Sequence, residues 1–125
     1  MGVRGSIVGT ASVVASRGYT RSIGYCMSKH VVLGLVRSAS AQLGVHGIRV
    51  NSVSPYAVAT PGVCSSLGRE VEEVKKIYEA YTSLKGIVLK GKHIGDAVLF
   101  LASEDSEFVT GHDLMVDGGF FTRMS

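Results

Sequence analysis

The chain has 125 residues, of which 46% are hydrophobic and 18% charged, a composition typical of one globular domain rather than of a disordered segment. Thirteen basic against ten acidic residues give a net charge of +3, and the basic residues are scattered, which argues against a nucleic-acid-binding surface. Two cysteines are too few for a disulfide scaffold, and no apolar run approaches the roughly 20 residues of a membrane-spanning helix. We therefore expect a cytoplasmic protein that binds neither nucleic acid nor membrane.

The first half of the chain predicts a strand, a helix and a second strand. Ser6 to Thr10 is a short apolar run bounded by glycine, which is typical of a buried strand, and Ala15 to Gly24 indicates a loop. From Gly24 to Leu43 the apolar residues recur at helical spacing. The alternating segment from Ile48 to Val53 predicts a strand that Pro55 stops.

The second half predicts two helices and a final strand. Tyr56 to Gly68 is expected to be a loop, and Glu70 to Leu84 has the pattern of an amphipathic helix. Ile94 to Ala102 predicts another helix, and Asp113 to Asp117 a last strand. Because strands alternate with helices, we expect one α/β domain built on a parallel sheet with helical crossovers.

Three short stretches match known motifs but are better explained by the fold. Met1 to Ser6 fits the myristoylation pattern, and Ser6 to Ala15 loosely resembles a signal peptide, but we interpret both as the approach to a strand. Gly86 to His93 nearly matches a phosphate-binding P-loop, yet His93 replaces the Ser/Thr that would reach magnesium, so a connecting turn is favoured. The four histidines lack metal-ligand spacing, so no metal site is predicted.

Tyr25 and Lys29 are the first candidates for a catalytic pair. They lie four residues apart in a predicted helix, about one turn, so the phenol and the ammonium would share one face. Ser12, at the end of the preceding strand, could meet them and hold a substrate oxygen while the phenol exchanges its proton. Tyr81 and Lys85 repeat the same spacing without a serine at the matching distance, so spacing alone does not distinguish the two pairs.

The order of these and later residues resembles the short-chain dehydrogenase/reductase family over nearly the whole chain. The matching motifs are Gly-Ser-Ile-Val followed by Ser12, Tyr-x-x-x-Lys at Tyr25, Gly-Ile-Arg-Val-Asn-Ser-Val-Ser-Pro up to Pro55, and a closing Val-Asp-Gly-Gly up to Gly119. The stretch Ser-Pro-Tyr-Ala-Val-Ala-Thr, which ends at Thr60, is most similar to plant members of the secoisolariciresinol and xanthoxin dehydrogenase type, which act on lignan and terpenoid alcohols.

The resemblance implies an NAD(P)-dependent oxidoreductase that transfers hydride between a small hydrophobic secondary alcohol or ketone and NAD or NADP. Tyr25 would be the acid/base, and Lys29 would favour its phenolate, since an unperturbed phenol ionises near pH 10. Ser12 would hydrogen-bond the substrate oxygen and orient it. Tyr25 and Lys29 would also contact the cofactor, with Lys29 on the nicotinamide ribose.

The segment after the second strand is also expected to hold the cofactor. By resemblance, Pro55 begins the loop, and Val58 and Thr60 anchor the nicotinamide carboxamide. Tyr56 replaces the glycine usual in the family, a departure that also occurs in the plant subgroup. Gly62 to Leu84 would be the mobile lid over the substrate.

Members of the family are roughly twice as long, and their first half forms the dinucleotide-binding unit. No G-x-G-x-x-G occurs in this chain. We therefore expect residues 1–125 to be a single partial domain: the C-terminal half of a Rossmann-like doubly wound parallel sheet, without its first strands and Gly-rich turn.

A half-domain of this kind is expected to be unstable or to aggregate alone, because the strand before Ser12 would form a bare sheet edge. Full-length relatives are expected to be homo-oligomers. The hypothesis of an enzyme, present as a fragment or truncated form, therefore stands beside that of a non-catalytic truncated relative that serves as a dimerisation or regulatory module.

Overall fold

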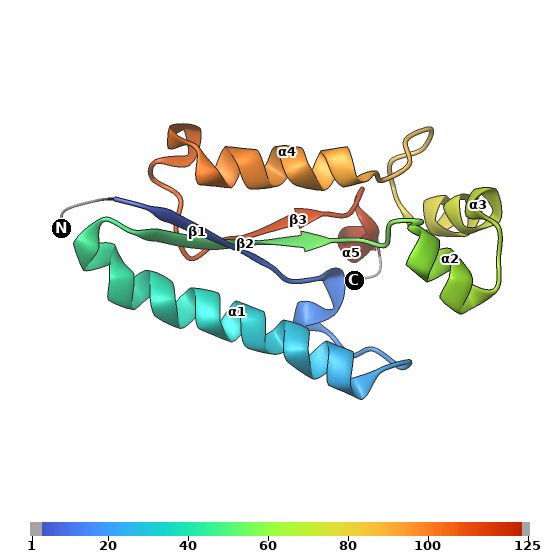
Figure 1. The fold of residues 1–125 in the computed structure, drawn as a ribbon, viewed down its shortest axis with the longest axis horizontal. Helices are drawn as coiled ribbons and strands as arrows, with labels where there is room; N and C mark the ends of the chain where they lie inside the picture. Colours follow the sequence, from blue (N-terminus) through green and yellow to red (C-terminus); the bar gives the residue numbers. More distant parts are fainter. Residues whose placement is uncertain (1–3, 124–125) are drawn as a thin grey trace.

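The computed structural model describes residues 4–123 and contains one sheet with helices on both faces (Figure 1). Its strands are parallel and lie in sequence order: β1 (Ser6–Thr10), β2 (Arg49–Pro55) and β3 (Asp113–Val116). The long helix α1 (Ile23–Leu43) covers one face, and α4 (Gly91–Ala102) covers the other. Because α1 connects β1 to β2 and α4 lies between β2 and β3, each helix belongs to a crossover between parallel strands. The predicted α/β class is confirmed.

The central strand carries buried polar side chains that attach β3 to it. Asn51 is fully buried and its amide donates to the carbonyl of Val109 at 2.9 Å. The hydroxyls of Ser52 and Ser54 donate to the carboxylate of Asp113 at 2.8 and 2.7 Å. Since an unsatisfied buried polar group costs about 1–3 kcal/mol, these bonds favour the observed pairing over any other register.

Arg49 fixes the end of α4 against the sheet. Its Nη1 donates to the carbonyl of Leu101 at 2.9 Å and to the hydroxyl of Ser106 at 2.8 Å, and its Nη2 donates to the carbonyl of Ser103 at 3.0 Å. The hydroxyl of Ser6, on β1, also donates to Leu101 O at 2.8 Å. The last carbonyls of a helix have no partner within it, and here two strands supply them.

The prediction of a loop from Tyr56 to Gly68 is wrong for α2 (Pro61–Leu67). Thr60 caps this helix, since its Oγ1 accepts from Val63 N at 3.3 Å, and Pro61 occupies the first helical turn. Gly68 ends it in the left-handed region, with φ of 64°. These are ordinary start and stop signals, and they outweigh the loop-like composition of the segment.

The longer helices are confirmed with shifted ends. Helix α1 begins one residue early, at Ile23, after the cap Ser22. Helix α3 (Val71–Tyr81) ends before Leu84. The backbone of Thr82 is extended rather than helical, and its hydroxyl donates to the carbonyl of Leu84 at 3.0 Å.

The P-loop-like stretch from Gly86 to His93 is a connecting turn whose last three residues open α4, so that helix begins at Gly91 rather than at Ile94. Four short helices were not predicted: η1 (Val13–Ser16), η2 (Gly44–His46), η3 (Glu104–Ser106) and α5 (Phe120–Arg123).

Helix α1 has a second apolar side that faces away from the sheet. Leu33 and Val36 are buried, whereas four apolar side chains spaced four residues apart are more than 60% exposed: Ile23, Met27, Val31 and Leu35. Strand β1 is an edge strand within residues 4–123, since only β2 pairs with it. The open edge of β1 and the exposed apolar stripe of α1 are both surfaces that promote association, as expected for a partial domain. Aggregation itself stays a prediction.

We expect the packing of α4 to depend on its sheet-facing residues. Leu101 is fully buried, whereas Leu99, two residues earlier, is 68% exposed. In chemical denaturation, Leu101→Ala should lower the free energy of unfolding by about 2–5 kcal/mol, because it leaves a cavity against β2. The matched change Leu99→Ala should cost no more than about 0.5 kcal/mol. Equal costs would contradict the described orientation of α4.

Candidate active site

The carboxyl ends of β1 and β2 meet at one edge of the sheet because the strands are parallel. Thr10, the last residue of β1, lies opposite Val53, and Ala11 N donates to Val53 O at 2.8 Å. Ser12 follows at once and is buried, with 8% of its surface exposed. Its Oγ accepts from Val14 N at 3.4 Å, a contact that leaves the hydroxyl hydrogen for another acceptor.

Small residues let α1 approach this edge closely. Ala11 and Ala15 are buried against Leu33, and Val32 packs on the same cluster. Gly9 makes room for Val32, since a Cβ at Gly9 would lie 3.3 Å from Cγ1 of Val32. A larger residue in β1 would therefore push the helix away from the strand.

Tyr25 and Lys29 occupy the first turns of α1, as their spacing predicts. Ser22 caps the helix by accepting from Tyr25 N at 3.3 Å. The ammonium of Lys29 lies 5.6 Å from the centre of the Tyr25 ring, within cation–π range. The same Nζ donates to Thr10 O at 3.1 Å. Lys29 thus links the phenol-bearing turn to the end of β1, two residues before Ser12.

The second Tyr-x-x-x-Lys pair is built differently. Tyr81 is the last residue of α3, so Lys85 lies beyond the helix. The ammonium of Lys85 folds back and donates to the carbonyls of Glu79 at 2.8 Å and Ala80 at 3.4 Å. It therefore satisfies the end of a helix, and the structure separates the two pairs that spacing alone could not.

The three candidates for the cofactor loop lie between β2 and α2. Pro55 ends the strand, Thr60 N donates to Val58 O at 2.8 Å, and Thr60 caps α2 with its hydroxyl oxygen. The structure places this loop at the same sheet edge as Ser12, because β2 runs parallel to β1. The roles of Pro55, Val58 and Thr60 in holding a cofactor stay predictions.

The donors at this edge fit the nicotinamide end of a dinucleotide. Lys29 has three ammonium hydrogens and gives one to Thr10 O, which leaves two for ribose hydroxyls. Thr60 accepts with its oxygen and keeps its hydrogen for a carboxamide oxygen. The phosphates have no such match, because the sequence lacks a Gly-rich turn. The chain therefore has donors for the nicotinamide end of the cofactor but no phosphate-binding turn for the other end.

An aromatic cluster beside the loop was not predicted. Tyr56 stacks on Phe120 with ring centres 4.5 Å apart and meets Tyr78 edge-on at 5.7 Å. The guanidinium of Arg17 lies 5.8 Å from the Phe120 ring and 5.2 Å from the Phe121 ring. The cluster joins the segments after β1 and β2 to α3 and α5. Its only sequence signal was a tyrosine where the family usually has glycine.

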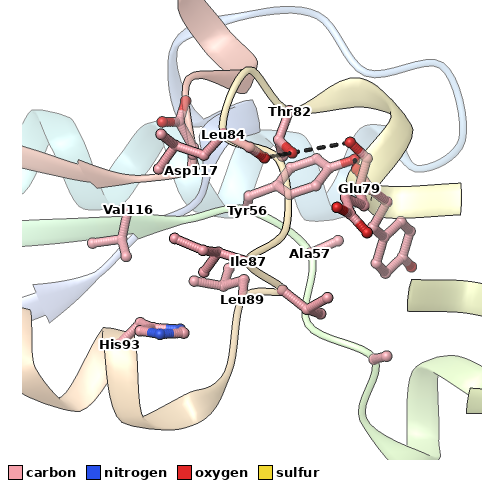
Figure 2. Close-up of a pocket in the computed structure, with 14 residues that line it drawn as sticks. Tyr56, Ala57, Glu79, Thr82, Leu84, Ile87, Leu89, His93, Val116 and Asp117 are labelled. Atoms are coloured by element: carbon pink, nitrogen blue, oxygen red, sulfur yellow. Dashed lines mark hydrogen bonds between the residues drawn. The ribbon is translucent and has the colours of Figure 1, made fainter. Parts of the chain in front are cut away.

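A cavity of about 290 Å³ lies on the far side of this loop (Figure 2). It is bounded by the loop after β2, the end of α3, the connection before α4, the start of α4 and the end of β3. Side chains that line it include Tyr56, Ala57, Leu84, Ile87, Leu89 and His93. Ser12, Tyr25 and Lys29 are not among its lining residues.

Burial, followed by the neighbouring phenols of Tyr78 and Tyr81, raises the pKa of Tyr56 to about 12. Its hydroxyl donates to Tyr78 O at 3.4 Å. Tyr56 therefore stays protonated near neutral pH and does not act as a base there. The pKa of Tyr78 is also raised, first by burial and then by Tyr19.

Residues 4–123 contain no group of three or more His, Cys, Asp or Glu side chains arranged to hold a metal ion. No helix in that range has the length and apolar character needed to cross a bilayer. Met1 to Val3, which begin the myristoylation pattern, lie outside the described residues.

Comparison with known proteins gives matches along almost the entire chain. A family model described as Enoyl-(Acyl carrier protein) reductase matches residues 1–121. A (+)-cis,trans-nepetalactol synthase of Nepeta racemosa is 55% identical over 116 residues, which cover 92% of this chain and 43% of the relative. A mitochondrial (-)-isopiperitenol/(-)-carveol dehydrogenase of Mentha piperita is 53% identical over 119 residues, covering 95% of this chain and 45% of the relative.

A solved structure shares the fold. The crystal structure of carveol dehydrogenase from Mycobacterium avium in complex with NAD superposes with a TM-score of 0.87 at 36% identity. The match covers 97% of this chain and 47% of that one. This chain thus spans about half the length of the proteins it matches, and its sheet corresponds to part of a larger one.

We expect the Tyr56 phenol to reduce stability at alkaline pH. An unfolded phenol ionises near pH 10, so the raised pKa of about 12 means that the folded state holds this proton more tightly. The stabilisation is complete below about pH 10 and is lost between about pH 10 and 12. In urea denaturation over that window, the free energy of unfolding should fall by about 1–2 kcal/mol more for the unmodified chain than for Tyr56→Phe.

Tyr25→Phe is the control for this titration, because Tyr25 is 46% exposed and contributes to the raised pKa of neither Tyr56 nor Tyr78. Its stability should follow that of the unmodified chain across the window. The assignment would be contradicted if Tyr56→Phe lost as much stability as the unmodified chain.

Proposed function

The chain belongs to the short-chain dehydrogenase/reductase family, and on that premise we propose that it is the catalytic half of an NAD(P)-dependent oxidoreductase. The reaction is hydride transfer between a secondary alcohol or ketone and the nicotinamide. The observation that carries the proposal is the position of Lys29, whose ammonium lies over the Tyr25 ring and donates a hydrogen bond to Thr10 O, two residues before Ser12. A phenol, a cation and a hydroxyl at one sheet edge suit proton transfer to a substrate oxygen.

In the oxidative direction, Tyr25 as phenolate takes the hydroxyl proton of the alcohol. The ammonium of Lys29 stabilises the phenolate charge. Ser12 donates its free hydroxyl hydrogen to the substrate oxygen and orients the carbon that carries the hydride. The oxidised nicotinamide, when bound, is the hydride acceptor. In the reverse direction, Tyr25 returns a proton to the oxygen of the ketone as it becomes an alcohol.

Binding of the nicotinamide end is assigned to the same edge. Lys29 would hold the ribose hydroxyls with Tyr25 beside them, and the loop of Pro55, Val58 and Thr60 would hold the carboxamide. The cofactor is NAD or NADP, and the residues that select between them belong to the family's dinucleotide-binding half.

The substrate is a small hydrophobic alcohol or ketone, and residues 62–84, which include α3 and most of α2, form the lid over it. The names of two similar proteins, a carveol dehydrogenase and an isopiperitenol/carveol dehydrogenase, support this class. We place the protein in the cytoplasm as a homo-oligomer when the whole domain is present. The Mentha piperita relative, in contrast, is named as mitochondrial.

A non-catalytic dimerisation or regulatory module is the second candidate. The exposed apolar stripe of α1 and the open edge of β1 favour it, because both surfaces would be covered by pairing with another chain. In this case the chain would have inherited the catalytic residues of the family but would not itself catalyse a reaction. The two candidates differ in whether residues 1–125 can complete a working site.

We expect residues 4–125 to restore activity when joined to the cofactor-binding half of the Mentha piperita relative. The assay follows NAD reduction with carveol as the probe alcohol. Tyr25→Phe and Lys29→Met should lower kcat roughly 10²- to 10⁴-fold, because they remove the acid/base and its cation. The matched change Lys85→Met should leave kcat unchanged, since Lys85 only binds carbonyls at the end of α3.

Two outcomes of the fusion experiment would contradict the enzyme. Lys29→Met and Lys85→Met could have the same effect, which would remove the special role of Lys29. A folded fusion that binds NAD without oxidising carveol or a panel of other secondary alcohols would favour the module. Circular dichroism of each variant separates these results from misfolding.

A further inference from the structure

The cavity of about 290 Å³ is a separate compartment from the proposed catalytic edge. Its walls come from the ends of β2 and β3, α3 and the start of α4, whereas Tyr25 and Lys29 belong to α1, on the opposite face of the sheet (Figures 1 and 2). Tyr56, Ala57 and Ala59 form the wall that it shares with the cofactor loop. A molecule in the cavity would lie behind that loop rather than against Tyr25.

His93 gives the cavity one directed hydrogen-bond donor. Its Nδ1 accepts from the backbone N–H of Lys90 at 2.9 Å, as part of the cap of α4. A backbone N–H can only donate, so the neutral ring must carry its hydrogen on Nε2. Nε2 has no hydrogen-bond partner among residues 4–123, and the ring lines the cavity beside Leu89 (Figure 2).

Most other polar side chains of the cavity are hydrogen-bonded to the backbone, whereas the hydroxyl of Tyr78, which also lines it, has no hydrogen-bond partner among residues 4–123. Glu79 accepts from Gly86 N at 2.7 Å, and the carboxylate of Asp117 accepts from two backbone amides at 3.0 and 2.8 Å. Thr82 donates to backbone carbonyls at 3.0 Å. Apolar side chains supply most of the remaining wall: Leu84, Ile87, Val88, Leu89 and Val116. The site therefore combines apolar walls with two free donors, Nε2 of His93 and the hydroxyl of Tyr78, a pattern that suits a small-molecule pocket.

We propose that this cavity binds a compact, uncharged, apolar ketone whose carbonyl oxygen accepts a hydrogen bond from Nε2 of His93. The volume sets the size of the ligand. An apolar cavity of about 150 Å³ holds one benzene, so about 290 Å³ holds on the order of twelve non-hydrogen atoms. Two carboxylates, Glu79 and Asp117, line the cavity together with the apolar side chains, so an anion would be repelled there.

The binding test uses two probes with the same carbon skeleton, propiophenone and n-propylbenzene, which differ in the carbonyl. Each is titrated at about pH 8 into the fusion of this chain with the cofactor-binding half of the Mentha piperita relative and followed by ligand-observed NMR, without cofactor, so no turnover occurs. We expect saturable binding of both, with propiophenone about 2- to 12-fold tighter, the range for one hydrogen bond. Absence of saturable propiophenone binding would overturn the proposal.

Histidine variants test the donor. In His93→Phe the preference for the ketone over the hydrocarbon should disappear, whereas His46→Phe, remote from the cavity, should keep it. The ratio of the two affinities is the readout because a general loosening of α4 would weaken both probes alike. A preference that survives in His93→Phe would overturn the assignment of the donor.

Filling the cavity tests the place of binding. Ala57→Leu and Ala59→Leu should each weaken propiophenone at least about 10-fold by occupying apolar volume, and Ala41→Leu on exposed α1 should not. If one variant fails to fold by circular dichroism, the other decides. Tyr25→Phe should leave binding unchanged. If Tyr25→Phe weakens the ketone and the alanine variants do not, the ligand occupies the catalytic edge and the proposal is wrong, while the proposed function stands.

Discussion

Parallel pairing of β2 with both of its neighbours is the constraint on which the rest of the structure depends. It makes β2 the buried centre of the sheet and forces its polar groups to find partners, which Asn51 and Ser54 do through β3 and the segment before it. It also brings the carboxyl ends of β1 and β2 to one edge of the sheet. Ser12 and Pro55 both lie at this edge although they are far apart in the sequence. The candidate site is a consequence of strand direction.

In the proposed function, the hydrogen bond from Lys29 to Thr10 O is the contact that holds the acid/base pair at that edge. It holds the first turns of α1, which carry Tyr25, beside the end of β1, and Ser12 comes two residues after Thr10. The same structure shows what the chain does not carry, since no Gly-rich turn accompanies these residues and its match covers 47% of the Mycobacterium avium enzyme. The account is of a divided site, with the reacting end here and the phosphate-binding end in the other half.

Local periodicity predicted most of the fold and the Tyr25–Lys29 pair, because both lie within single elements. Contacts between distant segments could not be predicted: Tyr56 stacks on Phe120, 64 residues later, and Arg49 reaches carbonyls at the end of α4. The cavity arises in the same way from five separate segments. Helix α2 is a different case: its start and stop signals, Thr60 and Gly68, were present in the sequence, but the prediction of a loop followed the composition of the segment instead.

The most direct test of the divided site is calorimetric titration of NADH into the 125-residue chain and into its fusion with the cofactor-binding half of the Mentha piperita relative. The account predicts that the fusion binds NADH saturably, and that the chain alone binds at least about 100-fold more weakly, because it can hold only the nicotinamide end. Equal affinity of the two proteins would contradict the account. So would a folded fusion that does not bind.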